Sequence, residues 1–219
     1  MIQKTRGKKT AAKSGVGKVL ASALGMAGRE EAKPATKLLM EQHEEVKALF
    51  KRIEKSKSHA EKTKLFEELA GNLVAHDAIE REIFYPACKR AMGMTDLLGE
   101  ALVEHGVVEF SVYQADQAGK DDFDFKCKVL SEIVEHHVKE EEDEFFPKVE
   151  KALGKERLAE LGARMKQRFE QAKAEDFRAP LAGNLKQVLA GAIEPAKRAA
   201  RSSTPSSVKL SKTKRRKAA

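Results

Sequence analysis

Tryptophan is absent from this chain of 219 residues, and only two tyrosines and ten phenylalanines supply aromatic bulk. No stretch approaches the ~20 consecutive apolar residues that a membrane-spanning helix requires. The two cysteines, Cys88 and Cys127, fit neither a zinc-binding spacing nor a disulfide framework. These scarcities predict a cytoplasmic protein with no transmembrane segment, whose two thiols are free and buried.

Glycine and proline are sparse through the middle of the chain, where Ala, Leu, Glu and Lys dominate and favour helix over strand. The formal net charge of +8 is unevenly distributed. Residues 1–33 contain eight Lys or Arg and two Glu, whereas residues 196–219 contain nine Lys or Arg and no acidic residue. Residues 34–195 contain 25 basic and 32 acidic residues. An acidic body therefore carries two basic tails, which are expected to be disordered because they contain few bulky apolar residues.

Apolar residues recur at helical spacing in four segments between residues 37 and 153, with breaks near 56–58, 92–95 and 118–122. No segment alternates with a period of two, so no sheet is predicted. The pattern indicates an all-α fold in which residues 34–153 form an antiparallel up-down-up-down four-helix bundle. Residues 154–195 are predicted to add a charged fifth helix and a sixth helix over 181–193. The fourth core-facing stripe is predicted to contain Phe125, Val129, Leu130, Ile133, Val134, Val138 and Phe145.

Two segments of eleven residues repeat one pattern: HDAIEREIFYP begins at His76, and HVKEEEDEFFP begins at His137. Each starts with His, has Glu four residues later and ends in Pro. Positions i and i+4 share a helix face, so each segment presents an imidazole beside a carboxylate, Glu80 in the first and Glu141 in the second. A buried glutamate is costly unless a cation accompanies it, so the pattern favours a metal.

Four of the six histidines occur one to a predicted helix, at intervals of 33, 29 and 32 residues: His43, His76, His105 and His137. A single histidine on an apolar helix face is more often a packed residue than a ligand, so a metal-free bundle with structural histidines is an alternative. The repeat at a constant offset from the terminal prolines favours ligands. That offset selects His137 rather than its neighbour His136, which is predicted to lie at the rim or just behind the ligands. His59 is predicted to be solvated in a charged loop.

Four imidazoles and two carboxylates suit a pair of borderline transition ions, with the carboxylates free to bridge them. Iron is favoured for its reactivity, and manganese and zinc are less favoured alternatives for the same groups. The residue three positions before each histidine is never Glu, which excludes the ferritin-type Glu-x-x-His site. No His-Glu-x-x-His zinc-protease motif occurs either.

Residues 36–153 resemble the hemerythrin-like, HHE cation-binding family through the strings EQHEEVKALF, HDAIEREIFYP, LVEHGVVEF and EHHVKEEEDEFFP. The pattern of that family is a His in the first helix, His-x-x-x-Glu in the second, a His in the third and His-x-x-x-Glu in the fourth. The resemblance implies a non-haem diiron centre whose ligands are His43, His76, Glu80, His105, His137 and Glu141.

Two positions depart from the oxygen-carrying hemerythrins. Glu109 stands where those carriers have a second His in the third helix, which makes it a second-tier candidate ligand. The carboxylate of the fourth helix also differs, because this chain has Glu141, whereas the carriers have an Asp one residue later. These departures disfavour simple reversible oxygen carriage. They favour a protein that senses or reacts with oxygen, peroxide or nitric oxide, or that handles iron, and a sensor or binding protein is favoured over a dedicated enzyme.

Basic residues gather near the C-terminus: Lys209, Lys212, Lys214, Arg215, Arg216 and Lys217. Such a run can neutralise phosphates, and the absence of interleaved aromatic residues indicates binding without sequence preference. The alternative function is therefore a nucleic-acid-associated stress protein tethered by its basic tails. A tail that only improves solubility is the other interpretation. The sequence leaves the oligomeric state open.

Overall fold

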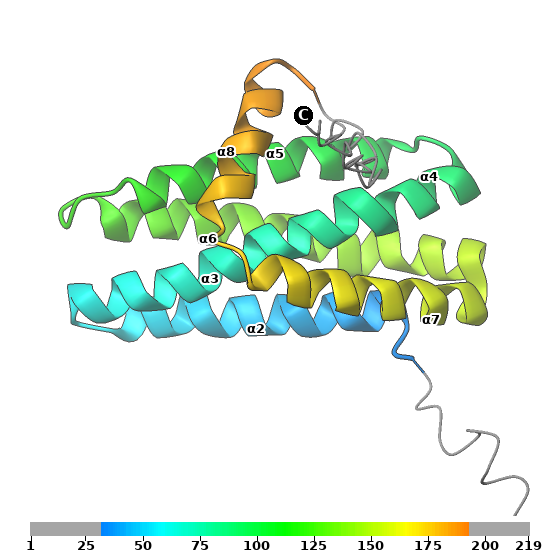
Figure 1. Cartoon of the computed structure of the whole chain (residues 1–219), viewed down its shortest axis with the longest axis horizontal. Helices are drawn as coiled ribbons and strands as arrows, with labels where there is room; N and C mark the ends of the chain where they lie inside the picture. The colour runs from blue at the N-terminus through cyan, green and yellow to red at the C-terminus, as the bar shows by residue number, and fades with distance from the viewer. Residues whose placement is uncertain (1–31, 193–219) are drawn as a thin grey trace, which may run out of the picture.

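The computed structural model describes residues 32–192, and within this range every regular element is a helix (Figure 1). The prediction of an all-helical fold is confirmed for this part of the chain. The basic tails fall outside the described residues, apart from Ala32 and Lys33. None of the described helices is long and apolar enough to cross a membrane.

The first two described helices, α2 (Ala35–Lys55) and α3 (His59–Ile79), are joined by a short turn and lie side by side (Figure 1). The Ser58 hydroxyl accepts a hydrogen bond from the Glu61 N–H and thereby caps α3. Because this cap precedes it, His59 is the first residue of α3, and the prediction that it lies in a loop is wrong. Its half-buried ring packs edge-on against Phe123, with the ring centroids 5.5 Å apart.

A π-helical turn begins at the glutamate of each histidine–glutamate motif. The two turns are η1 (Glu80–Phe84), between α3 and α4 (Tyr85–Met92), and η2 (Glu141–Phe145), between α6 (Phe123–Glu140) and α7 (Phe146–Lys173). Pro86 and Pro147 each occupy the first turn of the helix that follows. Proline has no N–H and its ring collides with the carbonyl four residues earlier, so a widened turn before it relieves the collision. Each proline of the repeated motif is therefore explained by the π-turn that precedes it.

The third long helix, α5 (Asp96–Asp116), is capped by the Thr95 hydroxyl, which accepts a hydrogen bond from the Leu98 N–H. Gly93 precedes it with a φ of 78°, a conformation that glycine adopts without strain. α5 packs beside α6 and α3, and α2 packs beside α6, so these four helices surround a common interior (Figure 1). The chain leaves the helices at the predicted breaks near 92–95 and 118–122.

The C-terminal part of the described chain consists of α7 and α8 (Arg178–Leu189). α7 is kinked at Gly154, where φ is 71°, so the fifth helix predicted after Gly154 is the second half of α7. At Gly162 α7 closely approaches the residues before α2, because a Cβ there would lie 1.9 Å from the Lys33 carbonyl oxygen. α8 packs on α5 and spans most of the predicted sixth helix. The division of the chain at residue 153 stays a prediction.

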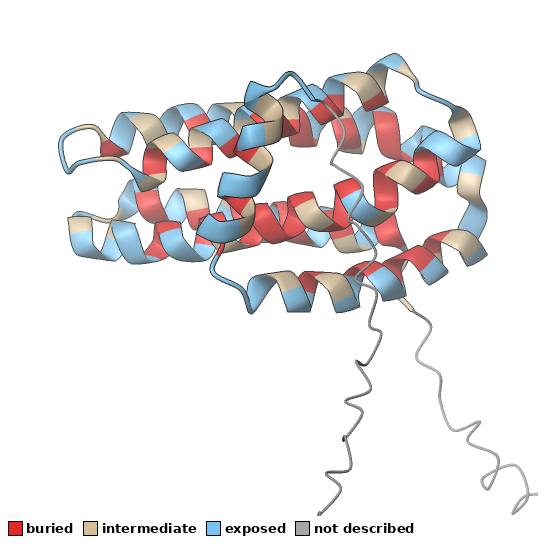
Figure 2. Cartoon of the chain, turned by 45° about the horizontal axis from the view of Figure 1, so that its top comes forward, coloured by how far each residue is buried: buried red, intermediate tan, exposed pale blue. Residues whose placement is uncertain are grey.

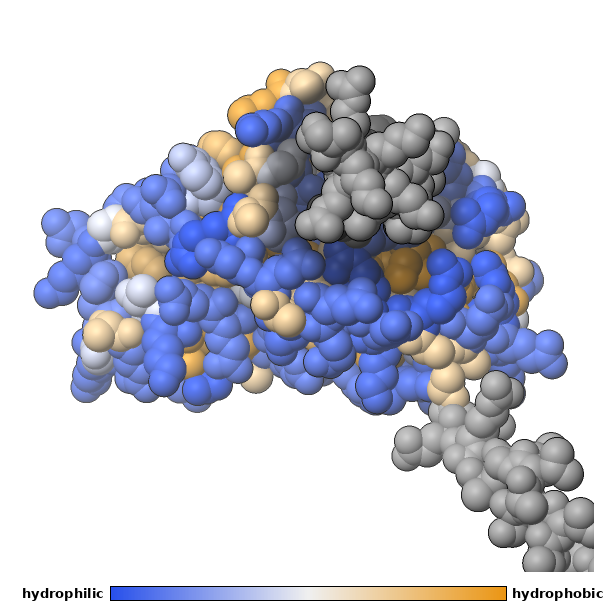
Figure 3. Space-filling model, viewed as in Figure 1, coloured by the Kyte–Doolittle hydropathy of each residue, from blue (hydrophilic) through white to orange (hydrophobic). Residues whose placement is uncertain are grey.

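Two hydrophobic clusters fill the interior, and Figure 2 marks the buried residues along the helices in red. Along α3 one cluster ends at Val74 and the other begins at Ala75. Where the clusters meet, a belt of buried polar side chains crosses the bundle, including Glu80 (0% exposed) and Glu141 (2% exposed). Figure 3 shows that the outer surface is mainly hydrophilic on the side in view. The fold thus places its buried charges between two apolar blocks.

The core-facing stripe of α6 differs from the prediction. Phe125 and Val129 are 58% and 50% exposed, so both face solvent. α6 carries two apolar faces of the same period, and the sequence pattern alone does not choose between them. The buried face consists of Phe123, Cys127, Leu130, Val134, His137 and Val138. Both thiols, Cys88 and Cys127, are free and buried, as predicted.

Candidate metal site

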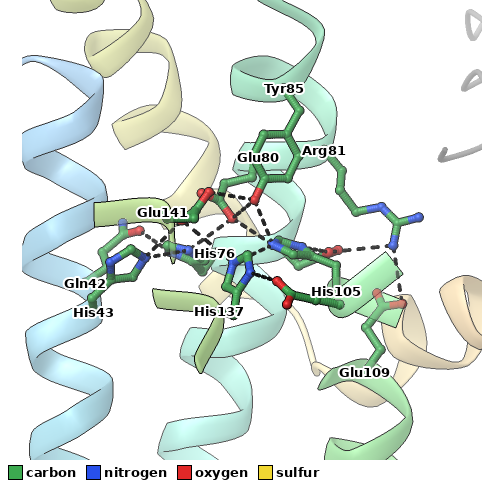
Figure 4. Close-up of polar contacts among 12 residues, drawn as sticks. Gln42, His43, His76, Glu80, Arg81, Tyr85, His105, Glu109, His137 and Glu141 are labelled. Carbon is green, nitrogen blue, oxygen red and sulfur yellow. Dashed lines mark hydrogen bonds and ion pairs between the residues drawn. The ribbon is translucent and has the colours of Figure 1, made fainter. Parts of the chain in front are cut away.

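The six side chains predicted as ligands come together in the buried belt (Figure 4). They form two groups, and in each group the candidate ligand atoms all lie within 4.8 Å of one another. One group is His43, His76 and Glu141, and the other is Glu80, His105 and His137. The bundle thus gathers residues from α2, α3, α5 and α6 and from the two π-turns at one place.

The carboxylates lie between the imidazoles rather than each beside one partner. Glu80 Oε2 is 3.1 Å from the Nε2 atoms of both His76 and His105. Glu141 Oε2 is 3.6 Å from His43 Nε2 and 3.7 Å from His137 Nε2. Each carboxylate therefore reaches imidazoles of both groups, which is the arrangement that a bridging ligand between two ions requires.

Each of the four histidines is oriented by a hydrogen bond at Nδ1, and each partner belongs to a different helix or turn. The four Nδ1 contacts are His43 with Glu142 at 2.8 Å, His76 with Gln42 at 2.8 Å, His105 with Asp77 at 2.6 Å and His137 with Glu104 at 2.8 Å. A partner that accepts at Nδ1 fixes the proton there and leaves Nε2 as a lone-pair donor. This is the tautomer that a metal ligand needs.

These orienting contacts form a closed ring around the bundle. Every partner is the sequence neighbour of another candidate ligand: Gln42 of His43, Asp77 of His76, Glu104 of His105 and Glu142 of Glu141. Gln42 on α2 holds the histidine of α3, Asp77 on α3 holds that of α5, and Glu104 on α5 holds that of α6. Glu142 on η2 holds the histidine of α2, which closes the circle of contacts. The polar residue beside four of the six candidate ligands is a sequence signal that the motif analysis missed.

The inward-facing atoms fit a bound cation. His43 Nε2 lies 3.3 Å from His76 Nε2, and His105 Nε2 lies 3.1 Å from His137 Nε2. In the tautomer that a metal ligand needs, with the protons on Nδ1, the two Nε2 lone pairs of each pair would face a shared cation. Glu80 Oε1 and Glu141 Oε2 are buried and have no hydrogen-bond partner among the described residues. Leaving such atoms unsatisfied costs free energy, which a cation coordinated by these donors would offset.

The two glutamates have opposite pKa shifts in the metal-free protein. Burial raises the pKa of Glu80, but attraction to His76 and hydrogen bonds from His105 and His76 outweigh it, so this pKa lies well below its ordinary value. Burial raises the pKa of Glu141 as well, and repulsion from Glu80 adds to it, so this pKa lies well above its ordinary value. The pair therefore holds its negative charge on Glu80 when no metal balances both.

The pKa values of three of the histidines also shift in opposite directions. Burial lowers the pKa of His43 to about 4 despite its hydrogen bond to Glu142, and burial also lowers the pKa of His137. Burial opposes the charged form of His105 too, but hydrogen bonds to Asp77 and Glu80 raise its pKa to about 10. His105, held between two carboxylates, is therefore the most basic of these three imidazoles.

Tyr85 is a member of the site that the sequence analysis missed. Its hydroxyl donates to Glu141 Oε1 at 2.8 Å and lies 3.0 Å from His105 Nε2 and 3.3 Å from Glu80 Oε2. Burial and the nearby glutamates raise its pKa well above the ordinary value, so the hydroxyl keeps its proton in the metal-free protein. A sequence signal exists, because Tyr85 precedes Pro86 where the second copy of the motif has Phe146 before Pro147.

Glu109, the second-tier candidate, belongs to neither ligand group. Its carboxylate lies 3.5 Å from Arg81 Nη1 and accepts a hydrogen bond from Asn184 on α8. Burial and repulsion from Asp77 raise the pKa of Glu109 to about 8. Asn184 also contacts Asp77 Oδ2, at 3.4 Å. α8 thus reaches the carboxylate that orients His105.

The remaining two histidines lie away from the buried site. His136 is exposed and lies 3.4 Å from a carboxylate oxygen of both Glu104 and Glu140. His59 opens α3 and packs on Phe123. Neither is in contact with the six gathered side chains, so choosing His137 over His136 from the proline offset agrees with where the structure places them.

Two comparisons with known proteins found matches. Residues 35–149 match the model of the hemerythrin HHE cation-binding domain. Among solved structures, the chain is similar to a hemerythrin HHE cation-binding domain-containing protein from Mycobacterium kansasii, with a TM-score of 0.59 and 27% sequence identity. The similarity covers 70% of this chain and 99% of that one. None of the curated proteins compared matches the chain.

Proposed function

Because the chain belongs to the hemerythrin HHE cation-binding domain family, we propose that its metal site is a non-haem diiron centre. The proposed ligands are His43, His76, Glu80, His105, His137 and Glu141. We propose further that the protein senses or reacts with a small ligand such as oxygen, peroxide or nitric oxide, or handles iron. Manganese and zinc are the less favoured occupants of the same donor set.

One observation carries this proposal: the Nε2 atoms of four histidines converge on two buried carboxylates, while a hydrogen bond at Nδ1 holds each ring from outside. Such a donor set suits borderline divalent ions. Two iron ions there would supply electrons for redox chemistry and open coordination positions for a small ligand. Glu109 is left out of the proposed set because Arg81 and Asn184 engage its carboxylate.

A cavity of about 30 Å³ lies directly beside the four histidines, large enough for one small molecule. Its other walls are mainly aliphatic, and they include Val46, Val74, Val108 and Val112. The cavity supports a ligand of diatomic or similar size. Larger substrates do not fit without a rearrangement of the core.

Tyr85 has a defined role in the proposed site. Its hydroxyl holds a proton beside Glu141 and His105, and it is the phenolic donor closest to both carboxylates. It would orient Glu141 by donating that proton. The nearby thiol of Cys88 is not suited to this role, because burial raises its pKa and a buried neutral thiol is a weak donor.

The test is metal analysis of freshly purified protein together with an optical spectrum and an oxygen cycle. About two iron ions for each chain are expected from six ligands of this kind. Carboxylates stabilise the oxidised ions more than imidazoles do, so oxygen admitted to the reduced protein should oxidise the iron and leave the spectrum changed after the oxygen is removed. Full reversal of the spectrum over repeated oxygen cycles would instead indicate oxygen carriage. Protein purified without bound metal would contradict the proposal.

The basic C-terminal tail carries a second candidate, association with nucleic acid. Residues 196–219 contain nine basic residues and no acidic residue. Binding through them should weaken steeply with salt, with a log–log slope no greater than ~8 in magnitude, and should not depend on sequence. Removing residues 196–219 should flatten that slope. An unchanged slope in the shortened protein would leave the tail without a role in binding.

A further inference from the structure

A surface groove of about 530 Å³ runs between α2 and α6. Charged side chains from both helices form its rim, including Lys47 and Lys128. Its lining is apolar where the helices approach each other, with Phe50 half-buried and the others buried. These apolar residues are Phe50, Ile53, Cys127, Val134 and Val138.

The groove and the cavity beside the histidines share two lining residues, Val134 and Val138 of α6. Both side chains are almost fully buried, with 5% and 3% exposed. They are four residues apart on one face of the helix, and Val138 follows directly after His137. A single layer of valine side chains therefore separates the proposed metal centre from a groove that opens to solvent.

We propose that this valine layer is the entry point of the ligand, and that Val134 and Val138 determine which ligands pass. The proposal rests on the proposed function. It narrows the ligand to a small, uncharged gas of low polarity, such as oxygen or nitric oxide. The wall offers no hydrogen-bonding side chain, so an ion or a strongly hydrogen-bonded molecule would lose its hydration without compensation on the way through.

The other sides of the cavity are less suited to a gas. On the side of α3 and α5, the lining includes the aliphatic residues Leu73, Val74, Val108 and Val112, but also two carboxylates. These carboxylates, of Asp77 and Glu109, are tied together from outside by Asn184 of α8. The side nearest Tyr85 is filled by its hydroxyl and by Glu80 and Glu141. The aliphatic side toward α2 and α6 is the one that meets a solvent-filled groove.

Valine side chains have stiff χ1 angles, so passage requires a brief rotation or displacement rather than a permanent channel. The size of residue 138 should therefore change the rates of entry and exit. It should change the equilibrium much less, because the valine does not form a hydrogen bond with the ligand. A change in both rates with little change in affinity is the signature of a barrier and not of a binding contact.

The first experiment measures nitric oxide binding to the reduced, iron-loaded protein by stopped flow. Val138→Ala should raise the association and dissociation rates together by about tenfold, and Val138→Phe should lower both by a similar factor. Val129→Phe is the matched control, because Val129 faces solvent on the same helix. Circular dichroism and iron content establish that each variant is folded and loaded. If Val138→Ala and the Val129 control give the same rates as the unchanged protein, the entry proposal is overturned.

The second experiment needs no metal. Dissolved oxygen is paramagnetic, so it broadens NMR signals of methyl groups that it reaches in the metal-free protein. The Val108 and Val112 methyls should show this effect in the unchanged protein, as should the groove-lining Ile53 methyls. In Val138→Phe the broadening at Val108 and Val112 should persist, because it reports how much oxygen occupies the cavity and not how fast the gas enters. Broadening at Ile53 with none at Val108 and Val112 would contradict the entry proposal. Nitric oxide failing to bind the loaded, unchanged protein would contradict the proposed function instead.

Discussion

Glu80 and Glu141 occupy equivalent positions, each four residues after a histidine and each the first residue of a π-turn, yet their surroundings differ. Glu80 Oε2 lies within 3.1 Å of two imidazole nitrogens, whereas the imidazoles nearest Glu141 Oε2 are 3.6 and 3.7 Å away. The closest partner of Glu141 is instead the Tyr85 hydroxyl, at 2.8 Å. Repetition in the sequence therefore sets the positions of the two carboxylates, but the tertiary neighbours decide which of them carries the charge.

The largest expected effect is on metal binding, for which both copies of the motif should be equally necessary. His76→Ala or His137→Ala should each weaken metal binding by more than ~100-fold, since the loss of an outer-shell partner alone commonly costs 10- to 100-fold. His59→Ala is the control and should keep its metal, because His59 lies at the start of α3. Metal content after dialysis checks this. Equal content in all three variants would contradict the ligand assignment.

Replacing the glutamates in turn should separate the two copies. In metal-free protein, Glu80→Gln removes the charge that contacts His76 and His105, and it should destabilise the fold by about 1–3 kcal/mol. Glu141→Gln should change stability by less than about 1 kcal/mol, because the amide oxygen still accepts from Tyr85. Urea denaturation of chelator-treated protein measures both. Equal losses, or a larger loss for Glu141→Gln, would show that the copies are equivalent after all.

Tyr85→Phe tests the hydroxyl that the first copy of the motif has and the second lacks, because it makes the first copy resemble the second at Phe146. The variant leaves a buried Glu141 oxygen without its donor, so a loss of about 0.5–1.5 kcal/mol in the free energy of unfolding is expected. The metal content should remain, while the optical spectrum of the loaded site should change. Tyr113→Phe, at an exposed tyrosine, is the control. A spectrum identical to that of the control would exclude Tyr85 from the site.

The smallest expected effect concerns α8, which approaches only the His105 side. Asn184→Ala removes hydrogen bonds to Glu109 and Asp77 and should cost about 0.5–1 kcal/mol. Because Asp77 orients His105, the NMR signal of the His105 Nδ1 proton should shift, and that of His43 should not. Lys186→Ala, on the exposed side of α8, should do neither. A shift at His43 of equal size would mean that α8 acts on the whole bundle.

Much of the fold followed from the sequence because its signals are local. Ser58, Thr95 and Gly93 stand at helix boundaries that capping chemistry indicates. The four-residue spacing within each motif likewise puts a histidine and a glutamate on one face. One failure is local, because the cap at Ser58 places His59 inside α3. The failure on α6 is not local. The outward orientation of Phe125 and Val129 depends on which face of α6 meets the other helices, which periodicity leaves open.

The orienting contacts of the site show the same limit. Gln42 stands beside His43 in the sequence but bonds His76 on the next helix. Asp77 likewise stands beside His76 and bonds His105. No spacing rule within one helix connects such partners, because the contact depends on how two helices are aligned along the bundle. The six candidate ligands could be named from the sequence, whereas the groups that aim them could be assigned only from the structure.

The ring of Nδ1 contacts also constrains the order in which the site can be assembled during folding. Three of its contacts join residues 34, 28 and 33 positions apart, but the fourth joins His43 to Glu142, 99 positions away. That last contact closes the longest loop and so carries the largest entropy cost of the four. When the chain has been synthesised only as far as α5, His43 is present but Glu142, the residue that orients it, is not. The complete donor set therefore exists only after η2 has returned to α2, which makes metal uptake a late event and ties it to completion of the whole bundle.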